Sequence, residues 1–441
     1  MSISIEMLTL VLILSMFVLF VTGLPIAFGL SAVAIILGFF FWGPQSLKLA
    51  AQVCYGSMSS WVLVALPLFV LMGFILAHSG IADTMFDMVH RWMGGINGGL
   101  AMGSVIVCTL MGAMVGIVGA GVMTMAVVAL PPMLERKYDK HLALGTVMAG
   151  GALGTVIPPS VSMIIYASVT KVSVGKMFAG GIIPGVILAA LYIIYIGIRG
   201  LLNPKAAPAL PPETRGTLIE RTIALRHVVL PIILILSVLG SIFAGAATPT
   251  EAAAVGCVGA VVCAIVYRKF SWKMLRDALF YTTKLFGLFM WIIIGASYFS
   301  QFYLCMGAGN LVKDTVLAAN VPPLLIVVFM QLSLIVLGAL MDDYAVILLA
   351  APLYGPVIMA LGYDPIWFGI LFILNMQMAV LTPPYGFALF YMKGVRPDMS
   401  MIDLYKSVVA FIPLQALSLA IVMVFPQLAL WLPGIIFKVG G

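Results

Sequence analysis

Two Pro-Pro pairs stand in the middle of long apolar segments, and they restrict the fold of this chain more than any other feature. One pair lies in residues 154–160 (GTVIPPS) and the other in residues 381–386 (LTPPYG). Proline lacks a backbone donor and clashes with the preceding helical turn, so we expect each pair to break a helix at mid-membrane depth. The freed carbonyl groups suit a cation, and the exposed half-helix N-terminus suits an anion. Two such breaks in corresponding positions are typical of the binding site of a secondary transporter.

The composition around these pairs is that of a polytopic membrane protein, because 63% of the 441 residues are hydrophobic and only 8% are charged. This balance excludes an ordinary soluble domain and predicts an all-α bundle. The first 22 residues have no basic leader and no small-residue cleavage site, which predicts a retained first helix. The ten segments long enough to cross are roughly residues 7–22, 25–42, 60–79, 142–168, 178–198, 228–247, 250–267, 285–306, 365–391 and 408–433.

Two further apolar segments, residues 98–132 and 322–359, are interrupted at their centres. The second is interrupted by Asp342 and Asp343. We interpret both segments as re-entrant hairpins that reach mid-membrane depth and return, since irregular backbone is tolerated there only inside protein or beside a water-filled cavity. The interruption of the first hairpin consists of Gly112, Gly116, Gly119 and Gly121.

Basic residues predict the orientation of the chain in the membrane. The connections 199–226 and 268–284 each carry five Lys or Arg residues, and two crossings separate them, so both are expected on the cytoplasmic side. The proline-rich connection 199–226 is interpreted as a linker between two halves. Amphipathic segments near 81–92 and 270–284 are expected to lie along the membrane surface as interfacial arms. The same count of crossings places both termini outside.

The two halves resemble each other at a spacing of 225 residues. This spacing relates Tyr138-Asp139 to Tyr363-Asp364, and it relates the first Pro-Pro pair to the second. The first Tyr-Asp loop carries basic residues and is expected inside, whereas Asp364 is the only charge of the second loop, which is expected outside. The two copies are therefore predicted to be inverted, as in alternating-access carriers.

Asp342 and Asp343 are the candidate cation-binding side chains. A carboxylate near the bilayer centre costs at least ~2.5 kcal/mol, and such a residue is a functional hypothesis by default. The pair predicts a cation or proton site at the second tip; the alternatives are a tip exposed to an aqueous vestibule or an acid paired with a basic group. In the first copy, Gly116 and Ile117 occupy the positions of Met341 and Asp342. A cation there would be held by backbone carbonyl groups and would suit sodium, unless the glycines only permit close helix packing.

The usual signatures of catalysis are absent from the sequence. It contains no Walker A loop, no zinc-ligand spacing and no Ser-His-Asp arrangement in a plausible aqueous site. No basic block suggests a nucleic-acid partner. We therefore expect no enzymatic activity and no covalently bound cofactor.

On its motifs, the chain resembles the large membrane (permease) subunit of tripartite ATP-independent periplasmic (TRAP) transporters, within the ion transporter superfamily. The resemblance covers essentially the whole chain. The residues that follow the second Pro-Pro pair are similar to those of the family branch named for mannitol and chloroaromatic compounds. This branch name does not define a substrate. The motifs that carry the resemblance are ALPLF at 65–69, the run from Pro131 through Tyr138-Asp139, GGALG at 150–154, IPPS at 157–160, residues 248–254, and LTPP at 381–384.

The resemblance implies an elevator-type carrier in which a scaffold holds a mobile transport domain. Residues 1–97 and 227–321 would form the scaffold with its arms, residues 98–198 and 322–441 the transport domain, and residues 199–226 a cytoplasmic linker. Sodium is the implied coupling ion, with one site between the first tip and the first break and another between the second tip and the second break. The implied metal-site residues are Gly116, Gly119, Gly154, Ile157, Asp342, Asp343 and Leu381.

The same resemblance implies a small organic acid as substrate, held between the two cation sites with its carboxylate at a half-helix N-terminus. It also implies two partners, a small four-helix membrane subunit and a periplasmic solute-binding protein, and a location in the bacterial inner membrane. The implied substrate-binding residues are Ser160, Pro159, Thr382, Pro384 and Tyr385.

The chain departs from the family pattern at the first tip, where Val115, Ile117 and Val118 replace serines that family members often have. Without those hydroxyls the ligand set of the first cation site is left open. Asp343 is a second departure, since a small or hydroxyl residue is more usual there.

The alternative functions are a stand-alone anion symporter or antiporter of the same superfamily, and a structural or proton-conducting subunit of an energy-transducing complex. An open channel fits least, because hairpins and breaks build an occluded site.

Overall fold

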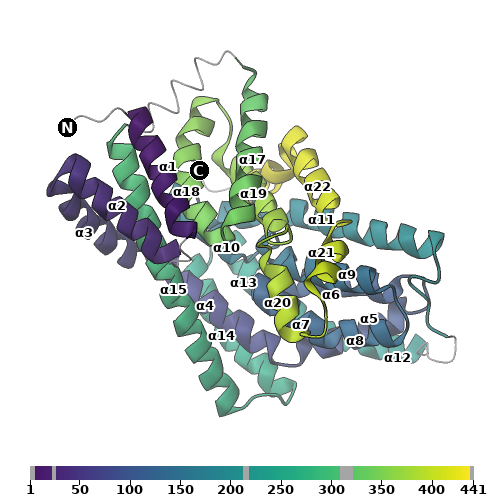
Figure 1. The fold of residues 1–441 in the computed structure, drawn as a ribbon. Coiled ribbons are helices and arrows are strands. Elements are labelled where there is room, and N and C mark those ends of the chain that lie inside the picture. Colours follow the sequence, from purple (N-terminus) through teal and green to yellow (C-terminus); the bar gives the residue numbers. More distant parts are fainter. Residues whose placement is uncertain (1–4, 22–25, 212–217, 308–320, 438–441) are drawn as a thin grey trace.

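The computed structural model describes residues 5–21, 26–211, 218–307 and 321–437, whose helices are drawn in Figure 1. These residues form α-helices, one short 3₁₀ turn and no strand, in agreement with the expected all-α fold. Seven of the described helices are long and apolar enough to cross a membrane. The number becomes eight if α3 (Gln45–Met58) and α4 (Trp61–Ala77), which are bent by 52° relative to each other, count as one span. Helices of this length and composition define a polytopic membrane protein.

The helices fall into two stretches separated by the connection after residue 202. Those of the first stretch are α1 (Ile5–Val21), α2 (Ile26–Trp42), α3, α4, α5 (Ile81–Met93), α6 (Gly99–Val115), α7 (Val118–Val128), α8 (Leu130–Glu135), α9 (Lys140–Gly151), the 3₁₀ turn η1 (Ala152–Thr155), α10 (Val161–Thr170) and α11 (Val174–Leu202). Those of the second are α12 (Leu218–Ala224), α13 (Arg226–Phe243), α14 (Pro249–Val266), α15 (Trp272–Cys305), α17 (Pro323–Leu340), α18 (Asp343–Ala360), α19 (Pro365–Ala379), α20 (Phe387–Val395), α21 (Met401–Val408), α22 (Ile412–Val424) and α23 (Gln427–Ile436).

The expected hairpins both contain a break at the expected place. α6 ends at Gly116, whose φ is 65°, and α7 starts after Ile117. α17 ends at Met341, and α18 starts after Asp342. In each pair the two helices contact one another, and the two breaks are 225 residues apart. In Figure 1 the first pair lies at the lower right and the second at the top.

The second interfacial arm is not a separate element, which corrects the prediction for residues 270–284. The arm and the following span form one helix, α15, of 34 residues. Ser271 caps its start by accepting a hydrogen bond from Met274 N, and no proline interrupts it. At 1.5 Å per residue α15 is about 51 Å long, which exceeds the ~30 Å hydrocarbon core. The predicted arm is therefore continuous with the membrane helix.

The last predicted span, residues 408–433, is divided into α22 and α23, with α21 before them. Pro413 lies in the first turn of α22, and Pro426 stands just before α23. Since proline cannot donate its backbone nitrogen to the preceding helical turn, each helix starts at its proline. The sequence interpretation overlooked these two positions.

The linker predicted at 199–226 is packed against the first half where the structure describes it. Ala206 O accepts a hydrogen bond from Asp139 N at 2.8 Å, and Ala207 O accepts one from Gly98 N at 2.8 Å. Leu210 is buried and donates from its backbone to Gly94 O at 2.6 Å. This stretch therefore docks on the start of hairpin 1 and on the first Tyr-Asp loop, because its backbone groups are paired there.

The contacts between the halves pair the half-helix after each break with the hairpin of the other half. α20, the half-helix after the second break, packs on α7 of hairpin 1, as Figure 1 shows. α10, the half-helix after the first break, packs on α18 of hairpin 2. The end of α10 meets the start of α19, where the Tyr166 hydroxyl donates to Pro365 O at 3.4 Å. The start of α9 meets α21, where Lys140 donates to Asp403 at 2.7 Å.

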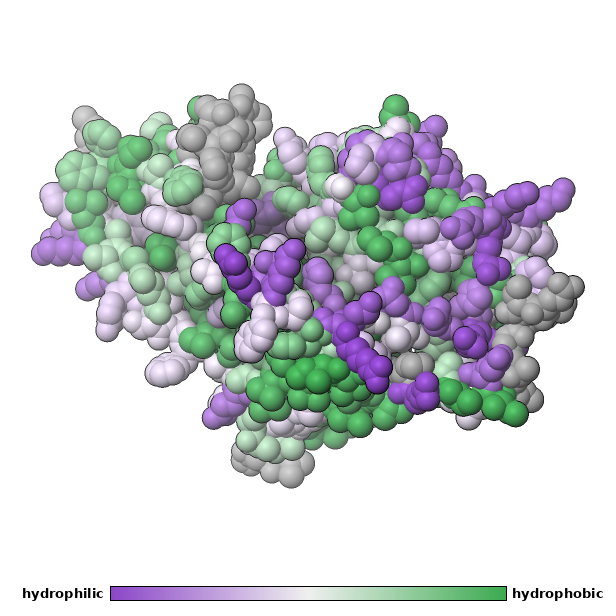
Figure 2. All heavy atoms as spheres, turned by 90° about the horizontal axis from the view of Figure 1, so that it is seen from below, coloured by the Kyte–Doolittle hydropathy of each residue, from purple (hydrophilic) through white to green (hydrophobic). Residues whose placement is uncertain are grey.

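Burial separates the centre of the molecule from its periphery. Nearly every residue of α6, α9 and α19 is buried, including Trp367 and Phe372. Peripheral helices expose large apolar side chains, such as Phe40 of α2 and Phe280 of α15. Figure 2 shows a continuous apolar area on the face seen from below. Exposed apolar surface on this scale suits contact with lipid.

Candidate functional site

The tip of hairpin 1 lies directly against the first break. The Gly116 carbonyl accepts a hydrogen bond from Val161 N, the first residue of α10, at 3.3 Å. A Cβ added to Gly116 would lie only 2.3 Å from the Pro159 carbonyl oxygen, and the positive φ of Gly116 favours glycine as well. Gly112 approaches Gly154 in the same way, since its Cβ would lie 3.1 Å from the Gly154 nitrogen. The two glycine-rich segments therefore form one compact backbone surface.

Ser160 holds the first break in shape. Its hydroxyl donates to Thr155 O at 2.5 Å and accepts from Met163 N at 3.4 Å, so it bridges the η1 turn and the first turn of α10. The Pro158-Pro159 bond between them is cis. Ser160 is completely buried. Its hydrogen bonds show a capping role, which the β-region backbone of an N-cap residue allows.

The second break is closed by its own backbone. Thr382 N donates to the carbonyls of Met378 and Ala379, and the Thr382 hydroxyl donates to Met378 O at 2.8 Å. Ala388 N, at the start of α20, reaches back to Val380 O at 3.1 Å. The Pro383-Pro384 bond is cis, like that of the first break. Both breaks therefore place a Pro-Pro turn between two half-helices.

A buried polar network joins the two breaks. At the end of α19, Leu381 N donates to Met378 O, which leaves the Gln377 carbonyl without a helical partner. Gln415 of α22 satisfies that carbonyl through its side-chain nitrogen at 3.1 Å. The side-chain oxygen of Gln377 in turn accepts a hydrogen bond from the Thr155 hydroxyl at the first break. Gln377 therefore connects the first break to the helix that leads into the second.

The tip of hairpin 2 carries the only two carboxylates of the described hairpin segments. Asp342 is the N-cap of α18 and accepts from Ala345 N at 2.8 Å. Asp343 is only 5% exposed and accepts a hydrogen bond from the Ser162 hydroxyl at 3.1 Å. Since Ser162 belongs to α10, this bond links the first broken helix to the second hairpin. The bond between serine and carboxylate compensates part of the cost of burying Asp343.

A cavity of about 130 Å³ lies beside these carboxylates, and we call it the aspartate cavity. It is enclosed by hairpin 1, hairpin 2, α15 and α20, so residues from both halves and from the long helix meet there. Besides Asp342 and Asp343, its lining includes the aromatic residues Phe289, Tyr344, Phe387 and Tyr391.

The structure brings together most of the predicted metal-site residues, in two groups. Gly116, Gly154 and Ile157 lie where the first tip meets the first break, and Asp342 and Asp343 lie at the second tip. Gly119, in the first turn of α7 and against the Tyr391 ring, lines the aspartate cavity together with these two carboxylates, and Leu381 is buried in the second break. Their role in cation binding stays a prediction.

The predicted substrate residues do not line the aspartate cavity. Ser160 and Pro159 are buried inside the first break, and Thr382 pairs its hydroxyl within the second. Pro384 and Tyr385 are exposed, Tyr385 by 55%. Substrate binding by these five residues stays a prediction.

Four polar residues of the site were missed by the sequence interpretation, namely Thr155, Ser162, Gln377 and Gln415. A signal for two of them was present, since an amide side chain inside an apolar span is expensive and marks a functional or structural site. Gln377 and Gln415 are both such residues. Ser162 carried no signal of its own, because its partner Asp343 is 181 positions away.

The donor set at the two tips fits a hard cation better than a transition metal. Within the described residues, no group of three or more His, Cys, Asp and Glu side chains comes together. The first tip offers backbone carbonyl oxygens, and the second adds carboxylate oxygens. Such oxygen ligands suit hard cations, whereas nitrogen and sulfur donors suit transition metals.

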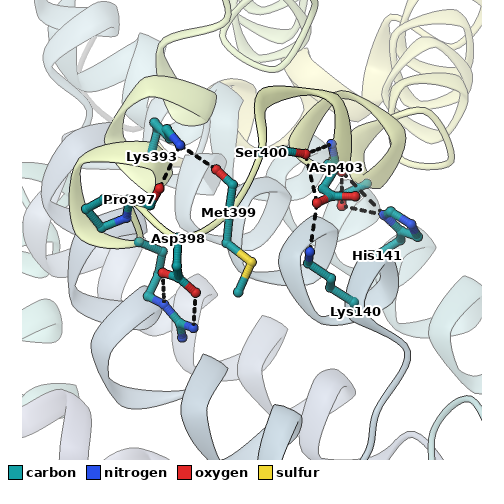
Figure 3. A network of polar contacts seen from close by, with 10 residues as sticks. Lys140, His141, Lys393, Pro397, Asp398, Met399, Ser400 and Asp403 are labelled. Atoms are coloured by element: carbon teal, nitrogen blue, oxygen red, sulfur yellow. Dashed lines mark hydrogen bonds and ion pairs between the residues drawn. The ribbon is translucent and has the colours of Figure 1, made fainter.

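On the side of the molecule where α20 ends, a second polar network ties the C-terminal part to the start of α9 (Figure 3). Lys140 pairs with Asp403 at 2.7 Å, and His141 Nδ1 lies 3.3 Å from Asp403 O. In the neighbouring loop, the hydrogen bonds from Arg396 lower the pKa of Asp398 to about 2. Both pairs are at least partly exposed to solvent, so they fix the register of the loop more than they stabilise the fold.

A polytopic helical protein with two broken helices and two hairpins that meet at buried polar groups has the architecture of a secondary transporter. Residues 13–428 match the family model described as the tripartite ATP-independent periplasmic transporter, DctM component. The chain therefore belongs to this family of transporter permease subunits, as the sequence resemblance predicted.

Two curated relatives and one solved structure illustrate the similarity. The chain is 33% identical over 406 residues to the C4-dicarboxylate TRAP transporter large permease protein of Pseudomonas aeruginosa, covering 92% of this chain and 93% of that protein. It is 30% identical over 436 residues to the corresponding protein of Vibrio cholerae, covering 94% of each. The YdaH transporter of Alcanivorax borkumensis has a similar fold, with a TM-score of 0.60, 15% identity, and coverage of 97% of this chain and 100% of that one.

Proposed function

We propose that this chain is the permease subunit of a binding-protein-dependent secondary importer, which couples inward movement of sodium to uptake of an organic acid. The observation that carries the proposal is the meeting of each interrupted segment with a partner from the other half. The second tip contacts α10 of the first half through Asp343 and Ser162, and α20 of the second half packs on α7 of the first hairpin. A site assembled from elements of both halves can change its exposure when those elements move together against the rest of the protein, which alternating access requires.

Sodium is the proposed coupling ion because the candidate sites are made of oxygen donors. At the second tip, Asp342 supplies a charge that a monovalent cation would neutralise. At the first tip, a cation would depend on the carbonyl groups of the glycine-rich backbone, since Ile117 offers no donor. Asp343 also allows a proton to act as a second coupling ion, because either sodium or a proton can neutralise a buried carboxylate.

The proposed mechanism is an elevator. The hairpins and broken helices, residues 98–198 and 322–441, form the moving part, and residues 1–97 and 227–321 form the scaffold. α15 supports this division, since one face of this uninterrupted helix lines the aspartate cavity through Phe289 and Ile292. An apolar helix face of this kind offers no fixed polar partners, so a domain can slide along it. About ten crossings in addition to the hairpins, with both termini outside, complete the proposed topology.

The proposed partners are a small four-helix membrane subunit and a periplasmic solute-binding protein, in the bacterial inner membrane. The family description names a tripartite periplasmic transporter, which supports both partners. An organic acid is the proposed substrate class, since the Pseudomonas and Vibrio relatives are named for C4-dicarboxylates.

The test uses proteoliposomes that hold the chain with the small membrane subunit encoded beside it. The cognate binding protein is loaded with radiolabelled organic acids, and an inward sodium gradient is applied. Accumulation that requires both the binding protein and sodium is the expected result. Uptake driven only by a pH gradient would replace sodium with protons in the coupling role of Asp342 and Asp343.

The second candidate is a stand-alone anion symporter or antiporter. The similarity of fold to YdaH, a single named transporter, keeps this candidate open as a fold-level analogy. Sodium-driven uptake of the free acid, without any binding protein, would favour it over the tripartite importer.

A further inference from the structure

The largest cavity among those described lies further along α15 and α18 than the aspartate cavity, at residues 293–304 and 351–359. Its volume is about 420 Å³, and it is enclosed by α3, α4, α10, α15 and α18. We call it the serine cavity because five serines line it, namely Ser57, Ser60, Ser168, Ser297 and Ser300. The connection 199–226 is predicted to be cytoplasmic, and the single crossing α11 separates it from the α10–α11 connection, so the positive-inside orientation assigns this cavity to the periplasmic half of the protein.

The polar side chains of the serine cavity have hydrogen-bonding capacity left over. Ser60 precedes α4 as its N-cap residue but makes no side-chain capping bond. Within the described residues, the structure pairs neither Ser168 nor Ser297 with another group, and the amide of Gln301 is exposed to the cavity without a partner. Hydroxyl and amide groups that converge on a cavity without partners are the usual means by which a pocket orients a polar ligand.

Lys171 is the single charged residue among the described residues that line this cavity. It ends α10 in a left-handed conformation with φ 61°, which turns the chain at this point. No carboxylate pairs with its ammonium group in the part of the chain that the structure describes, and none lines the cavity. An unpaired lysine at a pocket with no acid attracts an anion and repels a cation.

The two cavities therefore differ in both charge and size. The serine cavity has one cation and no carboxylate, whereas the aspartate cavity has two carboxylates and no basic residue. A volume of about 420 Å³ falls in the usual range of small-molecule sites, and about 130 Å³ falls below it. α15 lines both, the aspartate cavity up to Ile292 and the serine cavity from Ile293 onward.

We propose that the serine cavity is a binding station for a hydroxylated organic carboxylate, in which Lys171 binds the carboxylate and the serine hydroxyls with Gln301 bind the hydroxyl groups. This rests on the proposed function, since it gives the incoming acid a place on the periplasmic side before it reaches the hairpin tips. The cavity selects for hydroxyl groups because its own polar side chains would otherwise be desolvated without partners when an apolar acid entered.

The test measures equilibrium binding of radiolabelled D-gluconate to the chain and its small membrane subunit in nanodiscs, without binding protein. Lys171→Gln is compared with Lys171→Arg and with Lys176→Gln, a matched control on an exposed lysine five positions away that does not line the cavity. Mannitol, which lacks the carboxylate, and hexanoate, which lacks the hydroxyls, serve as competitors.

We expect Lys171→Gln to weaken gluconate binding by at least about tenfold, because a charge-assisted hydrogen bond is lost. Lys171→Arg and Lys176→Gln should retain binding, and both competitors should displace gluconate less well than unlabelled gluconate does. The second test is the double variant Ser297→Ala with Gln301→Leu. It leaves the charge of Lys171 in place and should reduce the difference in binding affinity between gluconate and hexanoate.

Absence of gluconate binding to the wild-type chain, or equal binding by Lys171→Gln, would overturn the inference. Either result can be distinguished from a failure of the proposed importer function. If sodium-driven, binding-protein-dependent uptake persists in Lys171→Gln with unchanged apparent KM, only the serine cavity loses its role. If gluconate binding depends on Lys171 while the wild-type chain shows no sodium-driven uptake, the cavity remains a carboxylate site and the importer proposal fails.

Discussion

The two hairpin tips occupy corresponding places 225 residues apart, but they present different chemistry to the centre of the protein. In the first tip, Gly116 turns the chain at φ 65° and Ile117 precedes α7 without a side-chain cap. In the second, Met341 is extended and Asp342 caps α18 through its carboxylate. The neighbouring position carries Asp343, which is bonded to Ser162. Its counterpart in the first tip is Val118, which has no polar group.

This difference shows that a repeated backbone does not require a repeated ligand set. The first tip packs closely on the first break at Gly116, because a Cβ at this position would collide with the Pro159 carbonyl. The second tip keeps room for side chains, and carboxylates fill it. Two cation sites built in this way would differ in strength, since carboxylates bind cations more tightly than neutral carbonyl groups do. The variants below test this asymmetry.

The largest effect is expected from removing the charge of Asp342. Asp342→Asn keeps a side-chain oxygen to cap α18 and removes the negative charge, so the fold should persist. Loss of about 3 kcal/mol of cation binding would lower sodium-driven uptake about a hundredfold. The matched change in the first tip, Ile117→Val, should leave uptake near the wild-type level. Asp342→Ala should also abolish coupled uptake. Normal sodium-driven uptake by either Asp342 variant would contradict the assignment of Asp342 to the cation site.

A smaller but still severe effect is expected from Gly116→Ala. The new Cβ would meet the Pro159 carbonyl oxygen at 2.3 Å and would occupy a left-handed conformation. Together these cost about 2–5 kcal/mol in stability, which thermal unfolding of the purified protein would detect. Met341→Leu, at the corresponding place in the second tip, should be tolerated because Met341 is extended. Equal stability of the two variants would show that the first tip does not need glycine.

Gln415→Leu tests the network that joins the two breaks. The change leaves the Gln377 carbonyl buried without a partner, which costs about 1–3 kcal/mol. The control is Gln427→Leu, because Gln427 is exposed at the start of α23. Thermal unfolding should separate the two variants, and an unchanged midpoint for Gln415→Leu would mean that the freed carbonyl is satisfied in another way.

The smallest effect is expected at the exposed loop of Figure 3. Arg396 lowers the pKa of Asp398 to about 2, so the pair contributes above the pKa of an unfolded aspartate, about 4, and is lost only as the pH falls towards 2. Asp398 therefore stays charged between pH 5 and 8. Asp398→Asn should change the uptake rate by less than about twofold and leave its pH profile in that range unaltered. A changed profile would show that this loop, and not only the carboxylates of the second tip, titrates during transport.

The sequence predicted the elements that depend on local chemistry. Proline chemistry alone placed both breaks, and glycine runs and paired aspartates placed both hairpin tips. Its errors came where local signals were weak. Pro426 divided a span that was expected to be whole, and α15 continued through a segment that was expected to be a separate arm. At the start of α14, Thr248 and Glu251 form a capping box, which is likewise a feature of residues close together in the chain.

What the sequence determined by itself was the all-α membrane architecture, the two breaks and the family, because each follows from residue types and short motifs that can be recognised without knowing which segments pack together. The tertiary structure decided which residues share a site. Ser162 meets Asp343 across 181 positions, and Thr155 meets Gln377 across 222. Only packing of the two halves brings these groups within hydrogen-bond distance. The physical reason is that burial makes an unpaired polar group costly, so partners must be supplied from wherever the fold can bring them, and chain separation gives no sign of them.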